Sequence, residues 1–305
     1  MFTQTAALTD GSPFADFITI SFNDRNTFPE QFLPLLKKLP KLIETVQLVD
    51  PSCQINWLVA FSDTGWAKAF KAAKPAALVP FTEMKEKDRH FPATDGDMFV
   101  FIKSTRMDLN FRISKGIADL FASCATVTED IQGYEYLKDR DMIDFVDGTE
   151  NPTEQARASA ILVGDEDPTY QGGSYITLQR YIHNLNKWND LKISQQEQVI
   201  GRTKTDNIEL SGAEKPPYAH VNKGKATDLD GKEIPMYRQN MPYGNAIEHG
   251  SMFIGFANTP EVVNISLRKM IYADSEGHYD RLLDYTRAVT GGIFFAPPAK
   301  FLNSL

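Results

Sequence analysis

Alternating apolar and polar positions along the chain predict half-buried strands. The clearest case is residues 17–22, where Ile18, Ile20 and Phe22 fall on one face. Unbroken apolar runs indicate strands that are covered on both faces. Together the two patterns add strands at residues 42–48, 55–61, 97–102, 174–181 and 252–257, and a short last strand from residue 294.

A second pattern, with apolar positions three and four residues apart, predicts helices. It is clearest at Ile113, Ile117 and Phe121, and Ser62 is placed to cap a helix that runs to about residue 71. Other helices are expected at residues 28–39, 184–191, 195–200, 259–272 and 279–287. Residues 203–250 lack either pattern, and so long an irregular stretch in a compact chain usually serves a function.

The order of these elements favours an α+β architecture. Several predicted strands are adjacent in sequence, which a doubly wound parallel sheet does not allow. The 305 residues suffice for one large domain or two ordinary ones. We expect two α+β halves, residues 1–130 and 131–305.

Composition and charge exclude some functions. The net charge is −8 and no Lys/Arg stripe is present, which argues against a nucleic-acid partner. No apolar stretch approaches a membrane span, and the N-terminus lacks the pattern of a signal peptide, so we expect a cytoplasmic protein without a membrane partner. Cys53 and Cys124 are far apart and without metal-ligand spacing, and we expect two free buried thiols.

The segment Asp144-Phe-Val-Asp147-Gly148-Thr149-Glu150-Asn151-Pro152 is the most informative in the chain. Asp-Gly and Asn-Pro are both strong turn signals. We therefore expect a shaped loop that fixes Asp147 in place, and such loops often carry function. Taken alone, an Asp-Gly pair is more often only a turn.

This segment resembles the signature loop of the dye-decolorising peroxidases, a family of haem enzymes. Their Gly-x-x-Asp-Gly motif, often continued by Thr-Glu-Asn-Pro, places an aspartate above the haem iron. The match here is complete from Asp147 to Pro152, but Asp144 stands where the family has its first glycine. Further segments that look like the B-type branch are residues 172–183, 200–204, 237–244, 289–292 and 294–297. Before residue 144 only the fold can be compared.

The resemblance implies a fold and an activity. Each half would be a ferredoxin-like unit with an antiparallel sheet and helices packed outside, as in a dimeric α+β barrel, and haem b would lie in the second half. The chain would reduce hydrogen peroxide via an oxoferryl intermediate and oxidise dyes, phenols or other bulky one-electron donors. Because the family often forms oligomers, we also expect a homo-oligomer. The alternative is a haem-binding protein for haem storage, transfer or iron release.

The resemblance also assigns the reactive residues. His220 precedes an Arg-Gln-x-x-Pro-Tyr-Gly segment, as the family's proximal iron ligand does, although a single histidine is more often structural. Arg238 would be the distal arginine, Asn240 would face the same pocket, and Asp147 would move the peroxide proton. We rank neither Asp147 nor Arg238 above the other.

The remaining assignments concern the haem environment. Asp280 is our first choice to accept the ring N–H of His220; Asp284, four residues on and on the same predicted helix face, is the alternative, and both could instead be solvated charges. The other implied contacts are Val146, Gly148, Thr149 and Glu150 from the loop, Ile200 and Phe253 beside the ring, and His183 and Arg202 on the propionate side. Ile200, Phe253, His183 and Arg202 could equally be ordinary packing residues or surface charges.

Asp144 departs from the motif. Glycine there would permit a positive φ or a close approach to haem, and aspartate tolerates left-handed geometry better than most residues. Two interpretations stay open: an exposed turn residue without a role, or a second acid that tunes the distal response to pH.

Overall fold

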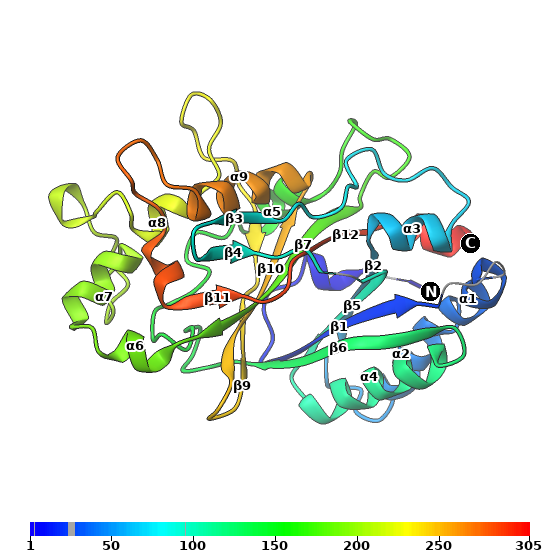
Figure 1. Cartoon of the computed structure of the whole chain (residues 1–305). Helices are drawn as coiled ribbons and strands as arrows, with labels where there is room; N and C mark the ends of the chain where they lie inside the picture. Colours follow the sequence, from blue (N-terminus) through cyan, green and yellow to red (C-terminus); the bar gives the residue numbers. More distant parts are fainter. Residues whose placement is uncertain (3, 24–27, 95) are drawn as a thin grey trace.

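A closed β-barrel forms the centre of the molecule (Figure 1). The computed structural model describes residues 1–2, 4–23, 28–94 and 96–305. Ten strands form one sheet: β1 (Phe14–Phe22), β2 (Asn56–Phe61), β5 (Met98–Ser104), β6 (Ala125–Tyr134), β7 (Ser174–His183), β8 (Tyr237–Arg238), β9 (Met241–Gly244), β10 (His249–Ala257), β11 (Thr286–Ala288) and β12 (Gly292–Ala296). Their order is β11-β7-β12-β2-β5-β1-β6-β9-β10-β8, and a further pairing of β7 with β10 closes the barrel.

The barrel is assembled from two halves of the chain. Strands β2, β5, β1 and β6 come from the first half, and β9, β10, β7 and β12 from the second, all paired antiparallel. The halves meet at two narrow seams, where Phe295 pairs with Phe61 and Gly133 pairs with Tyr243. This arrangement confirms the predicted α+β class with ferredoxin-like halves. The division at residue 130 stays a prediction, and β6 runs through that residue to Tyr134.

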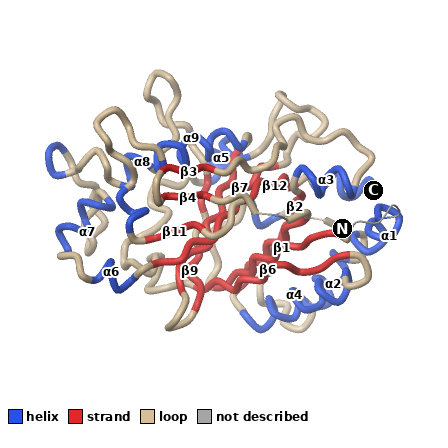
Figure 2. Tube along the Cα trace, viewed as in Figure 1, coloured by secondary structure: helices blue, strands red, loops and turns tan. Residues whose placement is uncertain are grey.

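Helices cover the outside of the barrel (Figure 2). They are α1 (Phe28–Leu36), α2 (Leu39–Gln47), α3 (Asp63–Ala69), α4 (Met107–Phe121), α5 (Glu154–Ile161), α6 (Leu185–Asn189), α7 (Ile193–Ile200), α8 (His220–Lys223), α9 (Pro260–Ile271) and α10 (Ala299–Ser304), with 3-10 turns η1 (Thr5–Ala7), η2 (Gly212–Glu214) and η3 (Arg281–Asp284). The expected stripe of α4 is buried against β1, β5 and β6. Ser62 caps α3, since its Oγ accepts the Gly65 N–H at 3.1 Å.

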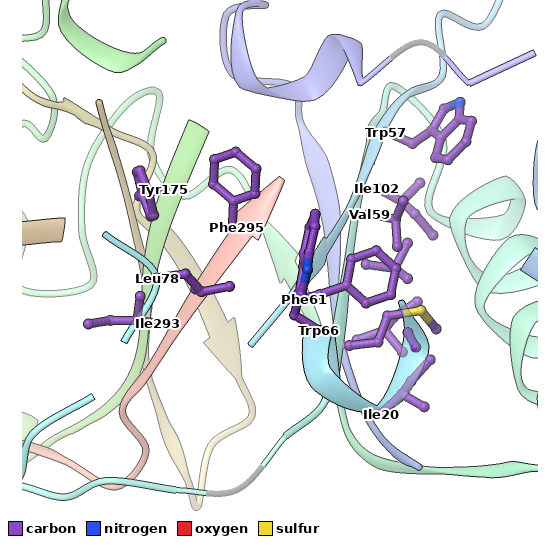
Figure 3. Packing of buried hydrophobic residues seen from close by; sticks show 14 of the residues in the cluster. Ile20, Trp57, Val59, Phe61, Trp66, Leu78, Ile102, Tyr175, Ile293 and Phe295 are labelled. Atoms are coloured by element: carbon purple, nitrogen blue, oxygen red, sulfur yellow. The ribbon is translucent and has the colours of Figure 1, made fainter. Parts of the chain in front are cut away.

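Two hydrophobic clusters hold this architecture together. Side chains such as Phe17, Phe101 and Ile254 fill the barrel interior, while Ile18 and Ile20 of β1 pack under the outer helices. Three aromatic side chains pack together where β2 meets β12. The ring centroid of Trp66 lies 6.4 Å from that of Phe61 and 6.0 Å from that of Phe295 (Figure 3). Burying each large aromatic side chain stabilises the fold by roughly 2–3 kcal/mol, which compensates for the sparse backbone pairing there.

The sequence prediction of a strand at residues 42–48 is wrong. The segment lies in helix α2, which buries Leu39, Ile43 and Val46. Those positions are four and three residues apart, so they share a helix face. The apolar positions of the segment suggested a strand, but packing against α4 decided its conformation.

The prediction of a helix at residues 279–287 is also wrong. The chain forms the short 3-10 turn η3 and then strand β11, which pairs with β7. Asp280 caps the start of this turn, and Tyr285 at its end directly precedes strand β11, so only four residues remain for the turn. Residues 28–39 likewise form a shorter helix, since α1 ends at Leu36 and Pro40 lies in the first turn of α2.

Two expectations about the chain as a whole can be compared directly. Cys53 and Cys124 are buried, as predicted, and no disulfide joins them. In the part of the chain that the structure describes, none of the helices has the length and apolar character needed to cross a bilayer.

Candidate functional site

A cavity with about 930 Å³ of empty space, part of it open to solvent, lies in the second half of the chain. Its walls come from the loop before Gly148, from β7, β8 and β10, and from α7, α8, α9 and η3. Most of the wall is apolar, including Phe145, Ile200, Phe253, Leu267, Met270 and Leu282. A large apolar cavity with few polar groups is the usual form of a cofactor site.

His220 enters this cavity from the first residue of α8. Its Nδ1 lies 2.6 Å from Oδ2 of Asp280, whose other oxygen accepts the Leu282 N–H at 3.0 Å. Asp280 is fully buried and can only accept, so Nδ1 of His220 carries a proton. Burial lowers the pKa of His220, but the Asp280 charge outweighs it and the net direction is upward. Nε2 is the ring nitrogen left to bind a metal.

Gly224 keeps the space beside the His220 ring open. A Cβ at this position would lie 3.1 Å from the His220 carbonyl oxygen and 3.4 Å from its ring Cε1. Any larger residue would press on the imidazole and reduce the room for a flat ligand.

Asp147, Arg238 and Asn240 meet in another part of the cavity wall. Strands β8 and β9 pair with β10 in one continuous register, and Asn240 lies in the interruption between them. Asn151 joins this segment to the loop, because its Oδ1 accepts the Arg238 N–H at 2.9 Å and its Nδ2 donates to the Arg238 carbonyl at 2.6 Å. The shaped loop thus fixes Asp147 relative to Arg238.

The surroundings of Asp147 favour its protonated form. Burial raises its pKa, and the negative charge of Asp141 raises it further. Arg238, the Gly148 N–H and the Asn240 side chain lower it, but the net direction is upward. The Gly148 N–H donates to Oδ1 of Asp147 at 2.7 Å, with Gly148 at φ +71°. Asp147 therefore loses its proton at a higher pH than an ordinary aspartate.

One acceptor in this wall lacks a partner. Oδ1 of Asn240 is buried and makes no hydrogen bond within the described structure. A second cavity, with about 1060 Å³ of empty space, shares Asp147, Arg238 and Asn240 with the first. These three side chains are therefore reached from two sides, and a small molecule with an O–H group would satisfy Asn240.

The rest of the loop borders a smaller adjoining cavity. Gly148, Thr149 and Glu150 line it together with Arg202. Oε1 of Glu150 lies 3.3 Å from Arg202 Nη2 and 2.8 Å from Lys225 Nζ, so both cations are held at this edge. Val146 and Ile200 line both this cavity and the main one.

His183 lies in the main cavity instead, apart from Arg202. Its Nδ1 is 2.8 Å from Thr286 Oγ1, and its Nε2 is 3.2 Å from Ser251 Oγ and 3.3 Å from Asp141 Oδ1. The structure therefore does not bring together the two residues that we expected on one propionate side. Every other predicted site residue lines one of the three cavities or, in the case of Asp280, contacts His220.

Asp144 adopts the left-handed conformation that the motif glycine would have, with φ +69°. It closes a tight turn, in which its N–H donates to the Asp141 carbonyl at 2.8 Å. Its carboxylate accepts the Tyr136 hydroxyl at 3.2 Å and lies 3.2 Å from Lys204 Nζ. Asp144 lies outside the lining of the three cavities described above, which supports the interpretation as a turn residue.

If the chain binds haem, as its resemblance to the peroxidases implies, replacing Asp144 by glycine should leave that binding intact, because glycine adopts this φ without strain. The lost contact with Lys204 is half-exposed and contributes little. Haem content per chain, measured by absorbance after reconstitution, checks this. Loss of haem in Asp144→Gly would contradict this account of the loop.

Comparison with protein-family models decides the family. The model of the Dyp-type peroxidase N-terminal domain matches residues 4–135, and the model of the Dyp-type peroxidase C-terminal domain matches residues 138–301. The chain belongs to the Dyp-type peroxidase family. A dye-decolorizing peroxidase of Mycobacterium tuberculosis is 37% identical over 270 residues, which cover 88% of this chain and 81% of the relative.

Solved structures of this family show the same fold. A DypB variant of Rhodococcus jostii RHA1 in complex with heme is 35% identical, has a TM-score of 0.94, and covers 99% of this chain and 98% of its own. The encapsulated DyP-type peroxidase of Mycobacterium smegmatis is 34% identical with a TM-score of 0.93, covering 98% and 97%.

Sequence reasoning missed Asp141, Gly224, Ser251 and Thr286 as cavity residues. Ser251 and Thr286 lie in strands whose pattern shows only burial. Asp141 is one of several acidic residues in and before the signature loop. Nothing in the sequence distinguished it from Asp139 or Asp144, since the direction of each side chain depends on the turn between them.

Proposed function

We propose that this chain is a haem b peroxidase of the dye-decolorising type, of the B-type branch. One observation carries the proposal: His220, backed by Asp280, enters the same apolar cavity as Asp147, Arg238 and Asn240. The apolar wall of the cavity, the free Nε2 of His220 and the space beside Gly224 all fit a flat ring with an iron at its centre. Bound haem would supply the one-electron and peroxide chemistry.

The residues around the cavity have distinct tasks in this proposal. His220 Nε2 would hold the iron, and Asp280 would fix the orientation and basicity of the imidazole. Arg202 and Lys225 at one edge would offer positive charge to the propionates, and His183 lines the main cavity. Ile200, Phe253 and Val146 would pack on the ring, while Gly148, Thr149 and Glu150 would line its edge.

Hydrogen peroxide would be handled by the three converging side chains. Ionised Asp147 would take the proton from one peroxide oxygen and give it to the other, which would leave as water when the oxygen–oxygen bond breaks. Bound haem would supply the two electrons for this cleavage and accept the remaining oxygen atom. The guanidinium of Arg238 stabilises the negative charge that develops on the leaving oxygen. Oδ1 of Asn240 can accept a hydrogen bond from peroxide, which would give that buried oxygen a partner. Haem storage alone would require neither Asp147 nor Arg238 in this arrangement.

The substrates in this proposal are hydrogen peroxide and a dye, a phenol or another small-molecule reductant. A homo-oligomer and a cytoplasmic location, both expected from the sequence, belong to the same proposal. The purified protein loaded with haem should show a Soret band that changes on addition of one equivalent of peroxide. A Soret band that peroxide leaves unchanged would exclude peroxidase activity and leave haem storage, transfer or iron release.

Trp188 offers bulky reductants a route for electrons that avoids the cavity mouth. It is buried behind the cavity wall, its Nε1 donates to the Ile143 carbonyl at 3.1 Å, and its ring lies 6.0 Å from Phe145. On its other side Tyr285, half-buried, lies 5.3 Å away between ring centroids. Trp57 and Trp66 belong instead to the cluster under the outer helices. Among the three tryptophans, Trp188 is the one placed to pass electrons.

Trp188→Phe should therefore slow the oxidation of a bulky dye and leave the rate of the peroxide step unchanged. Stopped-flow spectra of the Soret band measure the peroxide step, and dye bleaching measures the second. Trp57→Phe is the matched control and should change neither rate. Equal bleaching by Trp188→Phe and the wild type would exclude this route.

A further inference from the structure

A second carboxylate shares the cavity with Asp147. Asp141 lies six residues earlier on the same loop, and both line the cavity wall. Backbone hydrogen bonds fix the loop between them. The Asp141 N–H donates to the Phe145 carbonyl at 2.9 Å, and the Asp147 N–H donates to the Asp139 carbonyl at 2.9 Å. Asp144, the acid between the two, faces Lys204 instead. The second acid that the sequence left open is therefore Asp141 rather than Asp144.

The partners of Asp141 hold it as an anion. Oδ1 accepts the Ile143 N–H at 3.0 Å and lies 3.3 Å from His183 Nε2. Oδ2 accepts the hydroxyl of Ser251. Both oxygens are thus occupied as acceptors, and a proton on either would displace one of these donors.

His183 contacts the carboxylate of Asp141 from β7. Its Nε2 lies 3.3 Å from Asp141 Oδ1 and 3.2 Å from Ser251 Oγ, and its Nδ1 lies 2.8 Å from Thr286 Oγ1. Burial raises the pKa of Asp141, but the contacts with His183, the Ser251 hydroxyl and the Ile143 N–H lower it to about 2. Asp141 is therefore ionised in the cavity wall.

We propose that Asp141 is a positioning residue whose fixed negative charge sets the pH range in which Asp147 can accept a proton from peroxide. This inference rests on the proposed function. Asp141 touches neither the reacting oxygens nor the iron ligand, and it acts on Asp147 through its charge. His183 and Ser251 act one step further out, because they keep Asp141 ionised.

Electrostatics give the direction of this effect. Like charges in a buried site disfavour each other, because little water is present to screen them. After burial itself, the Asp141 charge is the largest cause that raises the pKa of Asp147, and Arg238 acts against it. With a raised pKa, Asp147 loses its basic form at a higher pH as the solution is acidified. Removing the Asp141 charge should therefore extend the reaction to lower pH.

Other charged groups also face Asp147, and an Asp141 substitution leaves them in place. The titratable and charged groups are Arg238 from β8, His220 from α8 and His183 from β7 in the main cavity, and Asp10, Lys103, Glu135, Asp139 and Arg140 in the second cavity. The difference between Asp141→Asn and the wild type therefore isolates one charge. Asparagine keeps the shape of the side chain and an oxygen to accept from Ile143 or Ser251.

The test uses the full-length, haem-loaded protein. For Asp141→Asn, the pH midpoint of the acid limb of the peroxide step, followed at the Soret band, should fall by about one unit. The control is Asp144→Asn, which removes an equal charge from the same loop and should leave the midpoint unchanged. A fall of the same size in both variants, or in neither, would overturn the proposal.

A readout without peroxide separates this inference from the proposed function. Infrared difference spectra across the same pH range report the carboxylic acid band of Asp147, which Asp147→Asn identifies by its loss. That band should titrate at lower pH in Asp141→Asn, whether or not the protein turns over peroxide. An unchanged band midpoint refutes the role of Asp141. If Asp141→Asn does not fold, Asp141→Ser removes the same charge and is measured in the same way.

Discussion

His220→Ala should abolish haem binding or weaken it severely. Nε2 of His220 is the nitrogen that the Asp280 hydrogen bond leaves free to hold iron within the cavity. Loss of an outer partner of a metal-bound histidine typically lowers metal affinity about 10- to 100-fold, so loss of the ligand itself should cost more. Haem content per chain and the Soret band after reconstitution measure the effect.

Asp280→Asn is the informative companion to that variant. Asparagine can still accept the His220 Nδ1–H, but it lacks the charge that makes the imidazole more basic. Haem should stay bound, with a more positive reduction potential of the iron. Normal haem content in His220→Ala would refute the ligand assignment, whatever Asp280→Asn does.

Removing either Asp147 or Arg238 should slow the peroxide step by about 100-fold or more. Asp147→Asn keeps the shape of the side chain but cannot take a proton. Arg238→Met keeps much of its length but cannot stabilise the leaving oxygen. Rate constants from stopped-flow spectra with peroxide in excess measure both losses, and haem content should equal that of the wild type.

The double variant shows whether the two residues act together. Asn151 fixes the segment of Arg238 to the loop of Asp147, so the two side chains should act on one oxygen–oxygen bond. The double variant should then be only slightly slower than the slower single variant. If one single variant keeps the full rate, the peroxide step does not require the residue that was replaced.

The sequence predicted the fold class well because its clearest elements are governed by local patterns. The apolar stripe of α4 can be buried only by packing against the sheet. The unbroken apolar run of β5 can be buried only in a strand that is covered on both faces. Where a segment suits two structures, tertiary contacts decide, as the α4 partner did for residues 39–47. Strand β6, with exposed polar positions along its length, gave no signal that the apolar pattern could detect.

The candidate site was predictable to the extent that motifs carry it. Residues from the signature loop and from residues 237–244 were found by resemblance, and the structure brings them to one cavity. Asp141 and Ser251 could not be found, since their importance depends on side-chain direction and on a strand pairing far along the chain. Asp280 was predicted as the partner of His220 on the face of a helix. It contacts His220, but it does so as the N-cap of a 3-10 turn.

The narrow seams of the barrel have a consequence for how the chain must be made. Without the second half, β2 would be an open sheet edge with the sequence Asn-Trp-Leu-Val-Ala-Phe, which has no charge and no proline. Such an edge pairs readily with other chains, so the first half should aggregate when expressed alone. Strand β12, which pairs with this edge, and Phe301, which stacks on Trp66, are both made late in synthesis because they follow residue 290. A nascent chain therefore needs protection at this edge until β12 has been made and can pair with β2.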